Sequence, residues 1–235
     1  MGYHLDFHQI LSGQYLDWLF SGVITTLELS VGAWLLAFLM ALALILIRLA
    51  PFRPAEWLVM VFVEYHQNVP ILVQIFFWYF AAPELLPNSL KLWVNAHDTE
   101  FILALLALAF CFSAYMSEDL RSGARAVPKT QYEASRALGF GYVSTMRYVV
   151  VPQALRIAIP PLVNHSLLLF KNSSLAMSVG VAELTYQTRE IENHTFRTFE
   201  AFAVATLIYL AISFLIMWAG STLDRRAKLF QTQAG

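Results

Sequence analysis

The chain has 235 residues, of which 58% are hydrophobic and 13% are charged. Ordinary soluble domains are roughly 45–50% apolar and about 25% charged, so this composition disfavours a water-soluble globule. The net charge of -1 gives no support to a nucleic-acid-binding surface or an acidic tail. The single cysteine, Cys111, cannot form an internal disulfide and is expected to be an inert, packed side chain.

Five windows are long and apolar enough to cross a membrane, since a bilayer core about 30 Å thick needs about 20 mostly apolar helical residues. The second window contains a polar cluster followed by Pro70. The fourth is interrupted by Pro160-Pro161 and by the polar run Lys171-Asn172-Ser173-Ser174. We therefore predict an all-α integral membrane protein with five transmembrane helices, formed by one domain over residues 1–235. The predicted spans are residues 18–47, 57–82, 101–115, 155–181 and 199–223.

The charged residues between these windows predict the orientation. The first seventeen residues contain no Lys or Arg, so a secretory signal is not indicated and the first span is expected to be retained. Of the 15 basic residues, 11 follow the first, third and fifth spans, whereas the opposite segments are acidic. Because basic residues accumulate on the cytoplasmic side, the N-terminus is predicted to be periplasmic and the C-terminus cytoplasmic.

The longest predicted cytoplasmic segment, residues 117–151, contains two helical patterns. One covers residues 129–138 and is expected to end at Gly139, because glycine commonly follows the last turn of a helix. The other covers residues 143–151 and is expected to stop at Pro152. A solvated basic connection between two spans is the alternative interpretation.

Residues 123–130 have the spacing of a phosphate-binding loop, but Pro128 stands where the second glycine is required. Proline has no N–H to offer a phosphate, and no apolar strand precedes it. Nucleotide binding by this chain is therefore not predicted, and the energy source must be a separate subunit or an ion gradient.

A spaced motif lies in the same segment: Glu133-Ala134-Ser135, then Gly139, then Val149 and Val151-Pro152. It resembles the cytoplasmic EAA loop of ABC importer permeases, with Ser135 and Val151 as small departures. The resemblance implies an ABC importer type I permease fold, in which this loop docks into a groove of an ATP-binding subunit. It assigns Glu133, Ala134, Ser135 and Gly139 to the ATPase interface. ATP and magnesium would then be bound by the partner ATPase, with no cofactor in this chain.

Further segments resemble the polar amino acid uptake branch of these permeases: residues 64–74, Ala114-Tyr115-x-x-Glu118, and residues 152–156, 160–164 and 171–175. The sequence Asn68-Val69-Pro70 is most similar to that of glutamate/aspartate permeases, although Gln67 stands where the branch usually has arginine. The resemblance implies a bacterial inner-membrane location, a second permease subunit, two ATP-binding subunits and a periplasmic substrate-binding protein. The second permease can be a paralogue or an identical copy, and we favour the paralogue.

Polar residues inside the second and fourth windows are the candidates for the substrate path. A charge at the bilayer centre costs at least about 2.5–3.5 kcal/mol, so Glu64 and Lys171 must face protein or water. Helices broken by proline at membrane depth are tolerated where they line a cavity. The alternatives are an ion pair between Glu64 and Lys171, or hydrogen bonds that only join helices. The candidates are Glu64, Gln67, Asn68, Gln74, Asn164, Lys171, Asn172 and Ser173.

Other interpretations weigh less. Glu28 is predicted to face the interior of the helix bundle. His66 and His165 are more simply core histidines than metal ligands, and no metal site or catalytic residue is predicted. An ion-coupled secondary transporter that uses Glu64 and Lys171 is the alternative function, but it leaves the Glu133 motif unexplained. No sequence motif supports an intramembrane enzyme.

We expect the transported substrates to include glutamate, aspartate, glutamine and asparagine.

Overall fold

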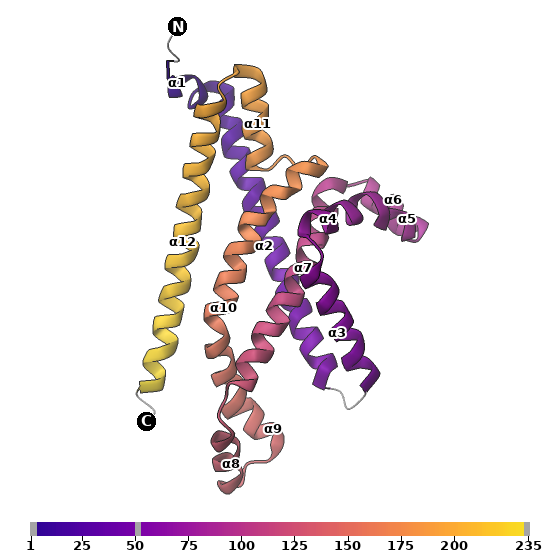
Figure 1. Cartoon of the computed structure of the whole chain (residues 1–235), viewed down its shortest axis with the longest axis vertical. Helices are drawn as coiled ribbons and strands as arrows, with labels where there is room; N and C mark the ends of the chain where they lie inside the picture. Colours follow the sequence, from indigo (N-terminus) through magenta and orange to yellow (C-terminus); the bar gives the residue numbers. More distant parts are fainter. Residues whose placement is uncertain (1–3, 50–52, 233–235) are drawn as a thin grey trace.

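The computed structural model describes residues 4–49 and 53–232, and the regular structure within these ranges is helical. Three helices are long and apolar enough to cross a membrane, and two bent helix pairs raise the number to as many as five. The long helices are α2 (Gly13–Leu49), α7 (Thr99–Arg125) and α12 (Thr198–Thr232). The short α1 (Phe7–Ile10) lies at one end of the molecule and the last turns of α12 lie at the other (Figure 1).

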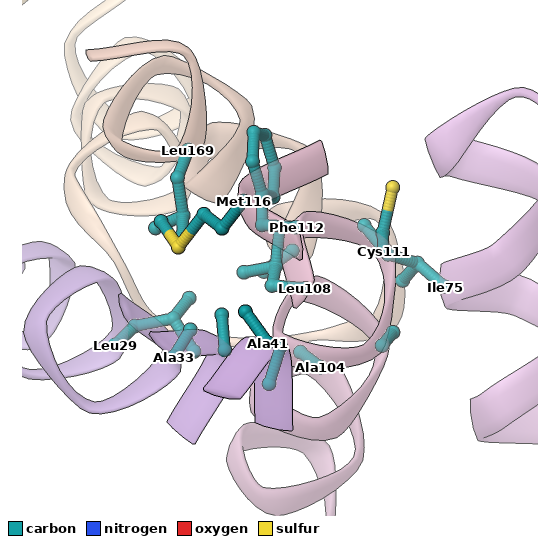
Figure 2. Close-up of a cluster of buried hydrophobic side chains, with 14 of the residues drawn as sticks. Leu29, Ala33, Ala41, Ile75, Ala104, Leu108, Cys111, Phe112, Met116 and Leu169 are labelled. Carbon is teal, nitrogen blue, oxygen red and sulfur yellow. The ribbon is translucent and has the colours of Figure 1, made fainter. Parts of the chain in front are cut away.

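The centre of the molecule is the contact between α2 and α7. Ala33, Ala37 and Ala41 recur every four residues on α2, so they form one face, and all three are fully buried. Figure 2 shows this face turned toward Ala104 and Leu108 of α7. Small side chains let two helix backbones approach closely, which is how helices associate where lipid removes the hydrophobic driving force.

The first bent pair consists of α3 (Arg53–Asn68) and the short helices that follow it. The chain turns by 110° at Pro70 and continues through α4 (Ile71–Phe76), the π-helix η1 (Phe77–Ala81) and α5 (Ala82–Leu85). The predicted break at Pro70 is confirmed, because proline lacks the N–H that would continue the helix. Helix α6 (Asn88–Asn95) then leads back to α7.

The second bent pair begins in the predicted cytoplasmic segment. It follows the separate helix α8 (Lys129–Ala137). Its elements are α9 (Tyr142–Thr145), the π-helix η2 (Met146–Val150), α10 (Val151–Asn172), the 3₁₀ helix η3 (Ser173–Val179) and α11 (Leu184–Thr195). The bend between the Tyr142–Val179 part and α11 is 50°. The predicted change of structure at Ser173 is confirmed, because α10 ends there and tightens into η3.

Two predictions about prolines are wrong. Pro152 does not stop a helix but lies in the first turn of α10, where the missing N–H has no helical partner to lose. Pro160 and Pro161 lie inside α10 and do not break it. A proline inside a membrane helix is tolerated where neighbouring groups satisfy the freed carbonyls.

The prediction for Glu28 is also wrong, because its side chain is exposed on the surface of this chain. Thr26 and Ser30, each two residues away on α2, are buried. A separation of two residues corresponds to about 200° around a helix, so Glu28 points away from the bundle.

The end of the fold that contains α1 and α11 is stabilised by a buried carboxylate and by a polar network. Glu183 is fully buried and caps α11, accepting from the backbone N–H groups of Thr185 at 3.0 Å and Tyr186 at 2.9 Å, while the Tyr209 hydroxyl donates to it at 2.8 Å. The polar network joins the N-terminal segment to α12.

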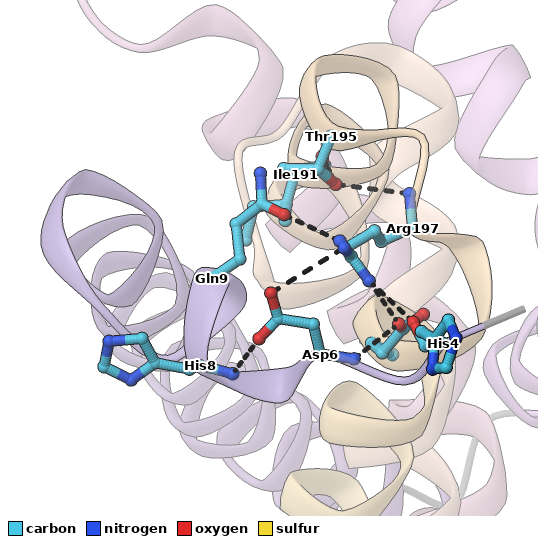
Figure 3. A network of polar contacts seen from close by, with 8 residues as sticks. His4, Asp6, His8, Gln9, Ile191, Thr195 and Arg197 are labelled. Carbon is cyan, nitrogen blue, oxygen red and sulfur yellow. Dashed lines mark hydrogen bonds and ion pairs between the residues drawn. The ribbon is translucent and has the colours of Figure 1, made fainter.

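In that network, Arg197 donates to Gln9 Oε1 at 2.6 Å, to Glu200 Oε1 at 2.9 Å and to the carbonyl of His4 at 3.2 Å (Figure 3). Asp6 lies 3.7 Å from the same guanidinium group, and its backbone N–H donates to Glu200 at 3.1 Å. A single arginine therefore holds α1 against the start of α12.

Candidate functional site

A cavity of about 350 Å³ lies at the bend between α3 and α4, and α7 and α10 complete its wall. Its polar lining comes from three of the predicted substrate-path residues, Gln67, Asn68 and Asn172, together with Tyr115 and His165. Apolar residues make up the rest of its lining: Val69, Pro70, Ile71, Cys111, Phe112 and Leu168. Residues more than 100 positions apart in the sequence thus meet at one broken helix.

The broken helix would leave backbone carbonyls without partners, and two side chains satisfy them. The carbonyl of His66 would normally accept from residue 70, but Pro70 has no N–H. The amide of Gln74 donates instead to His66 O at 3.0 Å and to Val69 O at 2.8 Å, and its Oε1 lies 2.6 Å from His66 Nδ1. The hydroxyl of Tyr115 donates to the carbonyl of Gln67 at 3.3 Å.

Gln74 therefore uses both ends of its amide to hold the bend, and its side chain is almost completely buried. It does not line the cavity. His66 is likewise buried and bonded to Gln74, as expected for a core histidine. Among the described residues, no group of three or more His, Cys, Asp or Glu side chains could hold a metal ion.

Glu64 reaches the cavity only through a neighbour. Its carboxylate accepts from Asn68 Nδ2 at 3.0 Å, and the same amide donates to the Glu64 carbonyl at 2.7 Å. Glu64 is exposed, and within the described ranges it forms no ion pair with Lys171. The ion-pair alternative is therefore wrong for this structure.

The other predicted path residues point elsewhere. Ser173 is fully buried and accepts from the hydroxyl of Ser30 at 3.1 Å. Lys171 lines a separate hollow of about 310 Å³ with Tyr209 and other hydroxyl-bearing residues, and Asn164 is exposed outside both spaces. Consecutive helical residues point about 100° apart, so Lys171, Asn172 and Ser173 cannot all face one cavity.

Sequence reasoning missed the pair formed by His165, which lines the cavity, and Asp119. His165 Nδ1 lies 2.5 Å from Asp119 Oδ2, and the ring of Tyr115 lies 5.0 Å from that of His165 at an angle of 34°. An ionised Asp119 only accepts hydrogen bonds, so it fixes the proton on Nδ1 and leaves Nε2 as the remaining polar atom of the ring. Tyr115 and Asp119 are four residues apart on α7, so both can face His165 of α10, but no local spacing links either of them to His165.

The predicted ATPase-coupling residues lie at the far end of the molecule, on and after α8 (Figure 1). Glu133 and Ala134 are exposed, whereas Ser135 is buried and donates to the carbonyl of Gln131 at 2.6 Å. Gly139 has φ +84, a left-handed conformation that favours glycine, and nothing lies within 4 Å of where a Cβ would be. The predicted helix end at this glycine is confirmed.

Next to these residues lies an apolar patch that sequence reasoning missed: Leu138, Tyr142 and Val143 are 78%, 73% and 74% exposed. Exposed apolar groups gathered on one surface indicate a protein or membrane contact. The patch and the exposed Glu133 share the end of the molecule that the sequence analysis assigns to an ATPase subunit.

The chain matches, over residues 33–229, the family described as "Binding-protein-dependent transport system inner membrane component", and it belongs to this family. It is 32% identical over 219 residues to the glutamate/aspartate import permease protein GltJ of Escherichia coli (strain K12), covering 92% of this chain and 89% of that protein. It is 33% identical over 225 residues to the probable glutamine ABC transporter permease protein GlnP of Bacillus subtilis (strain 168), covering 94% and 99%.

Comparison with a solved structure leads to the same family. The chain is similar to one titled "Crystal structure of an amino acid ABC transporter with histidines", with a TM-score of 0.84 and 30% identity over 95% of this chain and 100% of that one. The resemblance to amino acid ABC permeases predicted from the sequence is therefore confirmed. The chain is a transporter component rather than an enzyme.

The contacts of Gln74 predict a structural role. Replacing Gln74 with Met, which has a similar length, leaves the carbonyl of Val69 unsatisfied and leaves that of His66 with only the Cys111 thiol at 3.7 Å, so it should lower the stability of the protein by about 2 kcal/mol. The matched control is Gln67→Met, because the Gln67 side chain lines the cavity. Thermal unfolding in detergent should show a lower midpoint for Gln74→Met than for Gln67→Met, and equal midpoints would contradict the role.

The His165–Asp119 pair predicts an effect on transport without loss of folding. In Asp119→Asn the neutral amide replaces a charge-assisted bond and can donate to His165, which reverses the proton arrangement of the ring. We expect a severalfold higher KM for uptake, with a normal amount of protein in the membrane. Glu84→Gln, at an exposed ion pair with Lys91, is the control. An unchanged KM in Asp119→Asn would show that the pair has no role in substrate binding.

Proposed function

We propose that this chain is the permease of an ATP-driven importer of polar amino acids and that it crosses the bacterial inner membrane five times. Three apolar helices and two bent pairs supply enough helix for five crossings. The basic residues gathered after the first, third and fifth spans support a periplasmic N-terminus and a cytoplasmic C-terminus.

The observation that carries the proposal is the polar cavity at the broken helix. Its amides, hydroxyl group and histidine can hydrogen-bond the ammonium and carboxylate groups that amino acids share. The residues that we propose for the substrate path are therefore Gln67, Asn68 and Asn172, with Glu64 acting through Asn68. Lys171, Asn164, Gln74 and Ser173 have no access to this cavity in this structure.

The proposed partners follow from the family and from the two ends of the molecule. A second permease, which we take to be a paralogue, completes the pathway. Two ATP-binding subunits contact the surface formed by Glu133, Ala134, Gly139 and the exposed apolar patch beside them. ATP and magnesium are bound by those subunits. A periplasmic substrate-binding protein delivers the amino acid to the acidic outer segments.

The ion-coupled secondary transporter is not favoured. It requires Glu64 and Lys171 to act together, but Glu64 does not line the hollow that contains Lys171, and the two form no ion pair within the described ranges. It also gives no role to the α8 segment, and the family match covers that segment.

The proposed substrates are glutamate, aspartate, glutamine and asparagine. The relatives named for glutamate/aspartate import and for glutamine transport support this range. In the cavity, Gln67 offers neutral hydrogen bonds, and charge-assisted bonds are roughly twice as strong. Because the cavity has amides where strict acidic selection needs cations, acidic and amide side chains can both be accepted.

Coupling can be tested at α8. Glu133→Lys reverses an exposed charge, and Gly139→Val places a branched side chain at φ +84, where a left-handed conformation costs roughly 1–2 kcal/mol. Both variants should lose substrate-stimulated ATP hydrolysis and uptake in proteoliposomes, while the protein stays in the membrane. Thr130→Val, an exposed change on the same helix, serves as the control. Normal uptake without any ATPase subunit would overturn the ABC mechanism.

Selectivity can be tested by competition against labelled glutamate. Aspartate, glutamine and asparagine should each reduce uptake, and competition by aspartate alone would rule out the broad range. In Gln67→Arg a cation faces the cavity, so competition by glutamine and asparagine should weaken about tenfold relative to aspartate. An unaltered competition profile in that variant would show that Gln67 does not contact the substrate.

A further inference from the structure

A second large hollow lies at the end of the molecule that carries α8, away from the substrate cavity. This groove has a volume of about 630 Å³ and lies where α2, α3 and α7 meet α8, α9 and η2. Its lining combines basic and apolar residues: Ile45, Arg48, Glu56, Leu120, Arg121, Ala124, Arg125, Val127, Lys129, Tyr132, Tyr142 and Met146. The proposed transport mechanism gives this groove no role.

The groove has an excess of positive charge. Arg48, Arg121, Arg125 and Lys129 line it, against Glu56 alone. Glu118 forms ion pairs with Arg48 and with Arg121, so part of the charge is compensated from outside the lining. Arg125 and Lys129 are exposed and make no ion pair within the described part of the chain.

Arg48 supplies an independent sign of a missing ligand. Its side chain is only 10% exposed, and its Nε is buried without a hydrogen-bond partner. An unpartnered buried donor on a charged group costs free energy, and such groups in native proteins ordinarily have an acceptor. Because Arg48 lines the groove, an anionic group bound there would lie beside this incompletely bonded guanidinium group.

The position of Arg48 indicates the level of the groove relative to the membrane. It follows the long apolar stretch of α2 that ends at Ile47, so it stands where hydrocarbon gives way to the polar surface. Ile45, Leu120 and Val127 add apolar walls beside it. A ligand that fits must therefore carry an anionic group together with apolar parts, as a phospholipid does.

We propose that this groove binds the headgroup phosphate and upper acyl chains of an anionic phospholipid from the cytoplasmic leaflet. Arg48, Arg125 and Lys129 hold the headgroup. The ATPase is the less suitable occupant, because Tyr142 alone of the residues proposed to contact it lines the groove. The others lie outside the groove: Glu133, Ala134, Leu138, Gly139 and Val143. The proposal goes beyond the transport function and does not depend on which amino acid is carried.

Native mass spectrometry of the purified protein in detergent tests the proposal, with phosphatidylglycerol and phosphatidylcholine added at equal concentrations. One phosphatidylglycerol should be retained with about tenfold or greater preference. The double variant Arg125→Gln and Lys129→Gln should lose this preference and keep its thermal stability, because both side chains are exposed. The matched control, Arg225→Gln with Arg226→Gln, removes two exposed basic residues of α12 outside the groove and should retain it.

Three results would overturn the proposal: equal retention of the two lipids, unchanged retention in the double variant, or equal loss in the control. Displacement of the lipid by millimolar inorganic phosphate would also overturn it, since the groove would then be a site for small anions. Arg48→Gln is a second variant, and retention of the preference by a folded Arg48→Gln protein would contradict the role of the buried guanidinium. Uptake assays are not involved, so failure here is distinguishable from failure of the transport function.

Discussion

The constraint on which the rest of the structure depends is the need to satisfy backbone groups where a membrane helix is broken. At Pro70 the helix turns by 110°, and the carbonyl that would have bonded to residue 70 has no backbone donor. Inside a bilayer no water can replace that donor, and each unsatisfied group costs several kcal/mol. The amide of Gln74 takes its place, so one side chain allows the chain to bend at membrane depth.

The bend in turn creates the cavity. Gln74 satisfies His66 and Val69, so the side chain of Gln67 and the amide oxygen of Asn68 can face the cavity at the end of α3. Tyr115 donates to the carbonyl of Gln67, and its ring contacts that of His165 at an angle of 34°, which connects the bend to α7 and α10. Gln74 therefore holds the backbone from outside the cavity, whereas Tyr115 and Asn68 line the cavity and also donate to backbone carbonyls of α3.

Local chemistry made much of this predictable. Pro70 and Gly139 act through their own backbone properties, so the break and the end of α8 followed from the sequence. Predictions that depend on tertiary neighbours were wrong. Pro152 and Pro160 neither end nor break a helix, because α10 accommodates both, and Glu28 faces outward rather than into the bundle. The His165–Asp119 pair joins residues 46 positions apart, and no local pattern specifies which of two distant helical faces will meet.

The same distinction applies to the substrate-path candidates. The polar residues predicted at mid-membrane include three that line the cavity, because polar groups there need protein or water around them. The prediction did not indicate direction, and the three neighbours Lys171, Asn172 and Ser173 face a side hollow, the cavity and α2 respectively. Assigning a whole run to one site ignores the rotation of about 100° at each helical residue.

The contact at Gly123 has a consequence for how the cavity can open. A Cβ on this residue of α7 would lie 2.5 Å from the carbonyl oxygen of Ala154 on α10, so the two backbones touch. These helices supply Tyr115 and His165, and the contact makes them a single rigid wall. The opposite wall is the α3–α4 bend, which side-chain hydrogen bonds hold in place. The cavity can therefore widen with the least loss of packing if the α3–α4 bend moves as a hinge while α7 and α10 stay in contact.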